Sequence, residues 1–279
     1  MWKQKIGISV GARYEKPAVE VIEMLKRIGF DAVSLEWGKG CVPADAAEKA
    51  TEVGLEIQSL HAPFNKSDDM WSEDEAVYEP AVTELFEALD FCREYKIPVM
   101  VMHTWIGFDY DEKPTAKGLE NYGRVVDKAT EYGVKIAFEN TEGKEFLDAL
   151  MEHFKGNDTV GFCWDSGHEM CYNYSEDLLA QYGDRLIMTH INDNLGISDF
   201  NGRIFWTDDL HLLPFDGIAD WEENVSRLKK SRRMDILNFE LSIVSKPNRH
   251  ENDAYAEMGL EKYFTEAYMR ACRIAYRYS

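Results

Sequence analysis

Residues 159–165 read TVGFCWD, a short and mostly apolar run that ends abruptly at Asp165 and is followed by SGH. A run of this length without polar alternation is typical of a strand that is buried on both faces of a parallel sheet. Asp165 and the nearby His168 are good metal ligands, and both are costly to bury without a partner. The segment therefore predicts a buried strand whose end either caps the next helix or belongs to a site assembled from other parts of the chain.

The same pattern recurs along the whole chain, with each strand-like segment followed by a longer amphipathic one typical of a helix. The expected strands cover residues 5–10, 32–37, 55–62, 98–105, 134–140, 159–165, 186–193 and 236–242. The expected helices cover about 17–29, 43–54, 75–95, 115–133, 143–154, 175–183, 220–232 and 254–275. An open doubly wound sheet is the alternative, but GISVGARY (7–14) is not a glycine-rich nucleotide loop. Eight βα units predict an α/β fold, a single (β/α)8 TIM barrel that occupies residues 1–279 as one domain.

Composition limits the possible partners and the cellular setting. The chain has 279 residues and a formal net charge of −20, which is unfavourable for binding a long polyanion such as nucleic acid. Its five cysteines include no CxxC pair, which favours a reduced, cytoplasmic protein over a disulfide scaffold. Neither a signal peptide nor a membrane span is expected from the apolar runs. The oligomeric state stays open, and a homo-oligomer is one possibility.

Metal-ligating residue types stand where the expected strands end. The active sites of TIM barrels gather at the carboxyl ends of the strands. The residues at or just beyond these ends are His61, His103, Glu139, Asp165, His168, His190, Asp209, His211 and Glu240. Gathered at one barrel mouth, these groups would repel and desolvate one another unless a cation compensated them. The mixture of carboxylates and imidazoles predicts a divalent metal ion, with Zn²⁺, Mn²⁺, Co²⁺, Fe²⁺ or Mg²⁺ as the candidates.

The motifs AFEN (137–140), CWDSGH (163–168), THIND (189–193) and FELS (239–242) resemble the xylose-isomerase-like TIM-barrel superfamily, and the resemblance runs the length of the chain. In its ketose 3-epimerase branch one divalent ion is held from the ends of strands five to eight. The resemblance thus implies a single ion on Glu139, Asp165, His190 and Glu240, with His168 contacting the substrate. The expected activity is that of a metal-dependent isomerase or epimerase acting on a small ketose, aldose or hydroxyketone through an enediolate.

The superfamily offers two further alternatives. Its endonuclease-IV-type branch cleaves abasic DNA with three zinc ions, and ENTEG (139–143) and HINDNLG (190–196) resemble that branch. The candidates for its additional ligands are His61, His103, His168, Asp209 and His211. However, the loops NKSDDMWSEDE (65–75) and GFDYDEK (107–113) are acidic, which favours a small-molecule carbohydrate as partner over DNA. A metal-dependent dehydratase or lyase acting on polyol derivatives would begin with the same proton abstraction.

Specific roles follow for individual residues as hypotheses. Glu139 and Glu240, from non-adjacent strands, could form the acid–base pair on opposite faces of the substrate, and His168 would hydrogen-bond its oxygens. An aromatic wall suits stacking against the C–H face of a sugar, although packing under loops is the commoner use of such residues. The substrate-binding candidates at the barrel mouth are Glu36, Trp37, Phe64, Trp105, Arg203 and Trp206.

Overall fold

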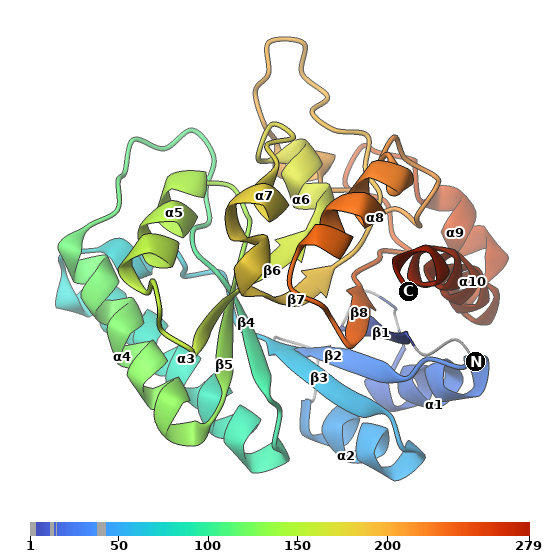
Figure 1. The fold of residues 1–279 in the computed structure, drawn as a ribbon, viewed down its shortest axis with the longest axis horizontal. Coiled ribbons are helices and arrows are strands. Elements are labelled where there is room, and N and C mark those ends of the chain that lie inside the picture. Colours follow the sequence, from blue (N-terminus) through green and yellow to red (C-terminus); the bar gives the residue numbers. More distant parts are fainter. Residues whose placement is uncertain (1–3, 12–13, 15, 38–42) are drawn as a thin grey trace.

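The structure, a computed structural model, describes residues 4–11, 14, 16–37 and 43–279. Its sheet has eight strands in the order β7-β6-β5-β4-β3-β2-β1-β8, all paired in parallel (Figure 1). The strands are β1 (Lys5–Val10), β2 (Ala32–Glu36), β3 (Glu56–His61), β4 (Val99–His103), β5 (Lys135–Glu139), β6 (Val160–Asp165), β7 (Leu186–His190) and β8 (Ile236–Phe239).

The two outer strands of this order approach each other and almost close the sheet. A parallel bridge joins Ile191 to Phe239, and the Ile191 N–H donates to the Asn238 carbonyl oxygen at 2.9 Å. The fold is therefore the expected single (β/α)8 TIM barrel, with the strands largely buried on both faces because one face packs on helices and the other on the barrel interior.

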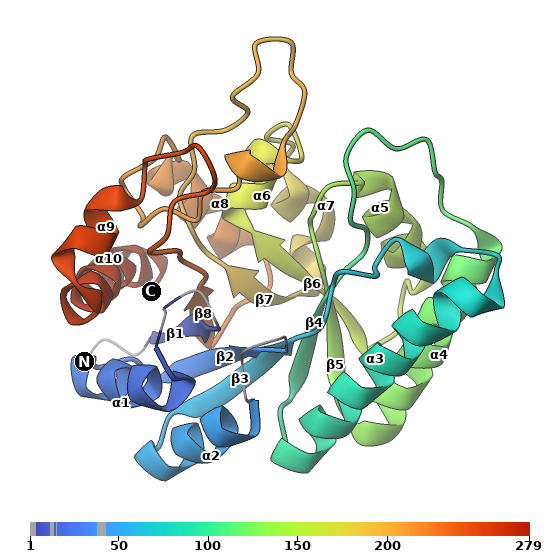
Figure 2. The same cartoon turned by 180° about the vertical axis from the view of Figure 1, so that it is seen from behind.

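Helices surround the sheet on its outer side, as the two opposite views show (Figures 1 and 2). A long loop between β7 and α8 rises beyond the carboxyl ends of the strands (Figure 2). No helix in the described part of the chain is long and apolar enough to span a membrane. The helices are α1 (Ala18–Ile28), α2 (Pro43–Val53), α3 (Glu75–Tyr95), α4 (Ala116–Tyr132), α5 (Lys144–His153), α6 (Ser166–Cys171), α7 (Leu178–Tyr182), α8 (Trp221–Lys230), α9 (Asp253–Met258) and α10 (Leu260–Tyr278).

Two helical segments differ from the sequence-based expectation. The segment expected as one helix over 175–183 forms only the short α7, because Asp177 caps it and accepts the Ala180 N–H through its side chain. A separate short helix, α6, directly follows β6. The segment expected as one helix over 254–275 is divided into α9 and α10 at Gly259, whose φ of 78° leaves the right-handed helical region. Neither difference moves a strand end.

Alternation along the strands separates the two apolar clusters of the barrel. Residues such as Met100, Ile136 and Phe162 belong to the large cluster between sheet and helices. The smaller cluster takes the alternate positions of β4 to β7, and its buried members are Val99, Val101, Ala137, Cys163 and Met188. Because successive side chains in a strand point to opposite faces, this smaller cluster occupies the β4–β7 side of the barrel interior.

The same alternation makes the polar side chains at the carboxyl ends of these strands face the barrel interior. His103, Glu139, Asp165 and His190 each stand two residues beyond a member of the interior cluster, so they point into the barrel. The sheet register pairs Glu36 with His61, His103 with Glu139, and Asp165 with His190. The fold therefore brings these side chains to one layer at the barrel mouth.

Candidate metal centre

Four buried side chains from successive strands converge at the barrel mouth. Glu139, Asp165, His190 and Glu240 each offer one ligand atom, and these atoms lie within 4.8 Å of one another. His190 Nδ1 lies 2.8 Å from Glu139 Oε1 and 2.9 Å from Glu240 Oε2. Glu139 Oε2 is buried and has no hydrogen-bond partner among the described residues. Three carboxylates and one imidazole, with an unsatisfied buried oxygen, fit a divalent cation well.

Asp165 both caps the helix that follows its strand and belongs to the candidate metal site. Its Oδ1 accepts the His168 N–H at 2.7 Å and so caps the first turn of α6. The Asn192 amide donates to both of its oxygens, at 3.1 and 3.0 Å. These bonds orient the carboxylate toward the four-ligand group without adding positive charge. The abrupt end of the 159–165 run is thus both a helix cap and part of the candidate site.

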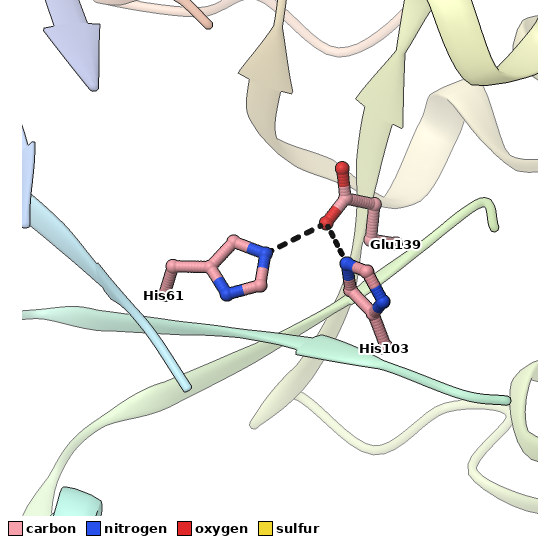
Figure 3. A group of neighbouring side chains, drawn as sticks. All are labelled: His61, His103 and Glu139. Carbon is pink, nitrogen blue, oxygen red and sulfur yellow. Dashed lines mark ion pairs between the residues drawn. The ribbon is translucent and has the colours of Figure 1, made fainter. Parts of the chain in front are cut away.

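A second group shares Glu139. His61 Nε2 and His103 Nε2 lie 3.3 and 3.4 Å from the same oxygen, Glu139 Oε2. Figure 3 shows both imidazoles pointing at this oxygen from neighbouring strands. The three residues form a further set of possible ligands, so Glu139 lies between two potential ion positions.

A third group lies on the loop side of the mouth and consists of His168, Asp209 and His211. His211 Nε2 lies 2.8 Å from Asp209 Oδ2, and His168 Nε2 lies 3.6 Å from Asp209 Oδ1. His211 adopts a positive φ of 49°, which turns the loop so that its ring faces Asp209. The structure thus brings together all nine residues that the sequence suggested as ligands, in three neighbouring groups of which two share Glu139.

Backbone carbonyl groups fix the orientation of three of these imidazoles. The Nδ1 atoms of His61, His168 and His211 lie 2.8, 3.0 and 3.0 Å from the carbonyl oxygens of Ala62, Asn140 and Glu240, respectively. A carbonyl oxygen can only accept, so each Nδ1 carries the proton in the neutral ring. In that tautomer Nε2 is the ring atom left to bind a metal ion, which is the arrangement that metal-binding histidines commonly use.

Charge in the four-ligand group is balanced by protons on imidazole. Burial opposes ionisation of Glu139, but His190, His103 and His61 outweigh it and hold the pKa of this carboxyl well below its usual range. Burial also disfavours imidazolium at His190, yet the surrounding acidic groups, Glu240 and Glu139 among them, raise the pKa of its ring well above the ordinary value. A bound cation would replace the imidazolium charge, so metal binding would release protons.

In the third group, too, neighbouring opposite charges outweigh burial and shift the pKa values of the ligand residues. Burial opposes a charged His168, but Asp165 and Asp209 raise the pKa of its imidazole well above the usual value. Burial likewise opposes ionisation of Asp209, and His211, Lys246 and His168 reverse this and lower the pKa of its carboxyl well below the usual range. Perturbed groups of this kind, gathered in one concave site, are typical of functional centres.

A pocket of about 710 Å³ opens directly over the ligand groups. Four of the six substrate-binding candidates line it: Glu36, Trp37, Phe64 and Trp206. Its apolar wall suits the C–H face of a small polyhydroxy compound, and its floor is formed by ligand residues. The further lining residues that bear on the site are His61, His103, Phe108, Glu142, His168, Tyr172, Asp209, His211, Glu240 and Lys246.

The structure places the other two candidates away from this pocket. Trp105 is buried and stacks on Phe146, with ring centroids 4.1 Å apart and planes at 4°. Arg203 lies on the long exposed loop and pairs with Asp109. Trp105 therefore acts as a packing residue under the loop after β4, and the Arg203 guanidinium is engaged outside the pocket.

Sequence reasoning missed two charged residues of the pocket wall. Glu142 is 5% exposed, and its Oε1 accepts the Gly107 N–H at 3.0 Å, while burial raises the pKa of its carboxyl. Its place three residues after Glu139 in ENTEG was the available signal. Lys246 is the one Lys or Arg that lines the pocket in the described part of the chain. It comes from the loop after β8, where no local pattern indicated it.

Cys163 lies at the bottom of the site. It belongs to the interior cluster, and its sulfur is within 4.8 Å of ligand atoms of Glu139 and His190. Burial raises the pKa of its thiol to about 12, so it stands as a neutral thiol beneath the four-ligand group.

Comparison with solved structures gives the same fold at low sequence identity. A structure of IolI protein with a bound zinc atom matches with a TM-score of 0.75 and 20% identity, covering 99% of each chain. The D-psicose 3-epimerase of Clostridium cellulolyticum H10, solved with D-tagatose, matches with a TM-score of 0.73 and 15% identity, again over 99% of each chain. At this identity the likeness concerns the fold.

Sequence comparison extends over most of the chain. An uncharacterised Sinorhizobium fredii protein, y4fM, is 27% identical over 81% of this chain and 82% of its own length. A Mycoplasma capricolum protein named as a probable endonuclease 4 is 28% identical over 48% of this chain and 52% of its own length. The family model described as xylose isomerase-like TIM barrel matches residues 22–262. The chain therefore belongs to the xylose isomerase-like TIM barrel family.

Proposed function

We propose that the protein is a divalent-metal-dependent isomerase or epimerase that acts on a small ketose, aldose or hydroxyketone. The observation that carries this proposal is the four-ligand group of Glu139, Asp165, His190 and Glu240, whose ligand atoms meet within 4.8 Å at the floor of the pocket. A divalent cation bound there would chelate a carbonyl oxygen and a neighbouring hydroxyl of the substrate, as Lewis acid and template.

The acid–base work falls to the two glutamates. Glu139 ends β5 and Glu240 follows β8, so they approach the pocket floor from different sides of the barrel. One glutamate removes the proton from the carbon next to the carbonyl and leaves an enediolate. Return of the proton to the neighbouring carbon isomerises the substrate, whereas return to the opposite face of the same carbon epimerises it. His168, held at Nδ1 by the Asn140 carbonyl, directs Nε2 toward the substrate oxygens.

Size and charge of the site favour a small uncharged substrate. The pocket of about 710 Å³ is in the range of small-molecule sites, and its walls carry Trp37, Phe64 and Trp206. The net charge of −20 opposes a nucleic-acid partner. The sugar epimerases among the structural neighbours support the same class of substrate.

The first experiment measures metal by elemental mass spectrometry, per chain, on protein purified without added metal or chelator. We expect at least one equivalent of a divalent metal. The metal-loaded protein is then incubated in D₂O with a panel of ketoses, aldoses and hydroxyketones, and exchange of the carbon-bound proton next to the carbonyl is followed by NMR.

The variant Glu240→Gln keeps the shape of the side chain and should slow this exchange by about 100-fold or more, because it removes one partner of the acid–base pair. The exposed Glu152→Gln, on α5, should exchange at the wild-type rate. Protein that retains no metal and binds none on reconstitution would contradict the proposal, as would metal-loaded protein that exchanges no member of the panel.

A multi-zinc hydrolase of the endonuclease-IV type is the second candidate. The specific observation in its favour is the presence of two further ligand groups, His61–His103–Glu139 and His168–Asp209–His211, beside the first. The partial match to a probable endonuclease 4 agrees with it. Two or three zinc ions per chain, together with cleavage of an abasic-site oligonucleotide, would favour this candidate over the isomerase.

A further inference from the structure

Lys246 places a positive charge on the third ligand group. It lies on the loop after β8, and its ammonium donates to Asp209 Oδ2 at 3.1 Å. The Lys246 side chain is only 23% exposed, and its Nζ also lies 5.6 Å from the centre of the Trp206 ring. This lysine is therefore held in the pocket wall and does not extend into solvent.

The same carboxylate is the centre of the His168–Asp209–His211 group. Asp209 Oδ2 already faces His211 Nε2 at 2.8 Å, so it serves two donors at once. His168 Nε2 approaches the other oxygen only to 3.6 Å. A dication drawn to Asp209 would meet a fixed ammonium on that carboxylate, and like charges at such short range in a water-poor site repel strongly.

The charge of this group contrasts with that of the four-ligand group. Glu139, Asp165 and Glu240 bring three carboxylates and one imidazole to a dication. The third group has a single carboxylate, and the ammonium of Lys246 offsets its charge. A dication is therefore bound much less favourably in the third group than among Glu139, Asp165, His190 and Glu240.

The contact between Lys246 and Asp209 is built into the fold by several links between two loops. The buried Asn252 donates its side-chain amide to the carbonyl oxygens of both Leu210 and Ser242, at 3.1 and 2.7 Å. Arg249 Nη1 pairs with Asp208 at 2.8 Å. The Ser242 N–H donates to the His211 carbonyl oxygen at 2.9 Å. These links hold the loop after β8 against the loop of Asp209 and His211.

We propose that Lys246 is a built-in cation that takes the place of a metal ion at the His168–Asp209–His211 group. The inference rests on the proposed metal centre and deepens it. Glu139, Asp165, His190 and Glu240 would hold the ion, and the third group instead presents His168 and Lys246 to the substrate as hydrogen-bond donors. A site with one group for metal and another for hydrogen bonds to the substrate fits the binding of a polyhydroxy compound better than hydrolysis by three zinc ions.

Metal stoichiometry tests this role without any assay of activity. Metal-free wild type and Lys246→Met are titrated with Zn²⁺ by calorimetry, and the saturated proteins are analysed by elemental mass spectrometry. We expect Lys246→Met to bind one more ion per chain, or to bind its weakest ion with a Kd at least about tenfold lower. Lys246→Arg keeps the charge and should behave as wild type. The control Lys144→Met removes a lysine of similar exposure, paired with Asp148 on α5, and should also leave the titration unchanged.

A second substitution locates the additional ion. His211→Ala in the Lys246→Met background should abolish the gained ion, whereas His61→Ala in that background should leave it in place. Equal stoichiometry and affinity in wild type and Lys246→Met overturn the inference, and so does an additional ion that survives His211→Ala. These results leave the proposed function intact. Wild type that binds no ion contradicts the proposed function itself, so the two failures are distinguishable.

Discussion

At the residue scale, Asp165 combines a structural and a chemical role in one side chain. Its Oδ1 caps α6 through the His168 N–H, and a carboxylate oxygen is offered to the four-ligand group. An amide oxygen caps a helix about as well as a carboxylate does, but it carries no charge to attract a cation. The two roles can therefore be separated by substitution.

We expect Asp165→Asn to keep the cap and lose the charge. Its free energy of unfolding in the metal-free state should stay within about 1 kcal/mol of wild type, while the Kd for Zn²⁺ rises by about tenfold or more. Asp165→Ala should lose both, with about 1 kcal/mol less stability than Asp165→Asn. Urea unfolding and calorimetric titration measure the two quantities. Equal metal affinity in Asp165→Asn and wild type would exclude Asp165 as a ligand.

The residues at strand ends could be predicted individually because their chemistry is visible in the local sequence. The residues that sequence reasoning misplaced or missed lie in loops. Trp105 directly follows the strand end at His103, yet its ring turns outward to stack on Phe146. Lys246 lies 37 positions from Asp209 in sequence, and only loop packing brings them together. Loop conformations have no periodic signal that reveals such pairs.

At the element scale, the loop that follows β7 depends on one buried carboxylate. Asp193 accepts the N–H groups of Phe215 and Ala219 at 2.8 and 3.0 Å, and the Trp221 indole N–H at 2.9 Å. Its backbone pairs with Leu212, next to His211. Asp193 therefore positions the third ligand group through the loop.

Replacing Asp193 by Ala should destabilise the protein by about 3 kcal/mol, because several buried donors lose their acceptor. The four-ligand group lies on the strands, so one metal equivalent should remain bound. Urea unfolding and elemental analysis measure the two effects. Asp199→Ala, in the exposed part of the same loop, is the control and should change stability by less than about 1 kcal/mol. A variant as stable as wild type would show that this carboxylate does not hold the loop.

The elements themselves were predictable where the apolar pattern is continuous. All eight strands lie within or close to their expected ranges, because a strand buried on both faces has a nearly unbroken apolar run. The helices that differed were those that begin or break at a single residue, Asp177 and Gly259. The segment 254–275 has helical composition on both sides of Gly259, and the break between α9 and α10 falls at that residue because its φ of 78° lies outside the right-handed helical region.

At the scale of the whole molecule, the buried imidazoles couple stability to pH. The pKa values of His168 and His190 are raised well above the ordinary 6.5 in the folded protein. Their contribution to stability is therefore fully present below about pH 6.5, and it is lost as the pH rises through the folded-state pKa. The lowered pKa of Glu139 contributes above its ordinary value of 4.5 and stays constant in this window.

For metal-free protein we expect the free energy of unfolding to fall by about 1 kcal/mol or more between pH 6 and pH 8. Metal-loaded protein should lack this decline, because the cation replaces the imidazolium charge and binds better as the ligands lose protons. Urea unfolding across this range, with and without metal, measures both. The exposed His153→Gln should follow the wild-type profile. Metal-free stability that rises over this range would contradict the charge balance described for the site.

The sequence by itself predicted the barrel and the set of candidate ligand residues. Repeated apolar runs separated by amphipathic helices predict a parallel sheet, and the residue type that ends each run is a local property of the chain. The tertiary structure alone decided how the ligands divide into three groups, which of them Lys246 neutralises, and which aromatic residues reach the pocket. Those outcomes depend on sheet register and on loops that pack against each other across long sequence separations. Such contacts are set by the packing of the whole chain and leave no trace in any one segment.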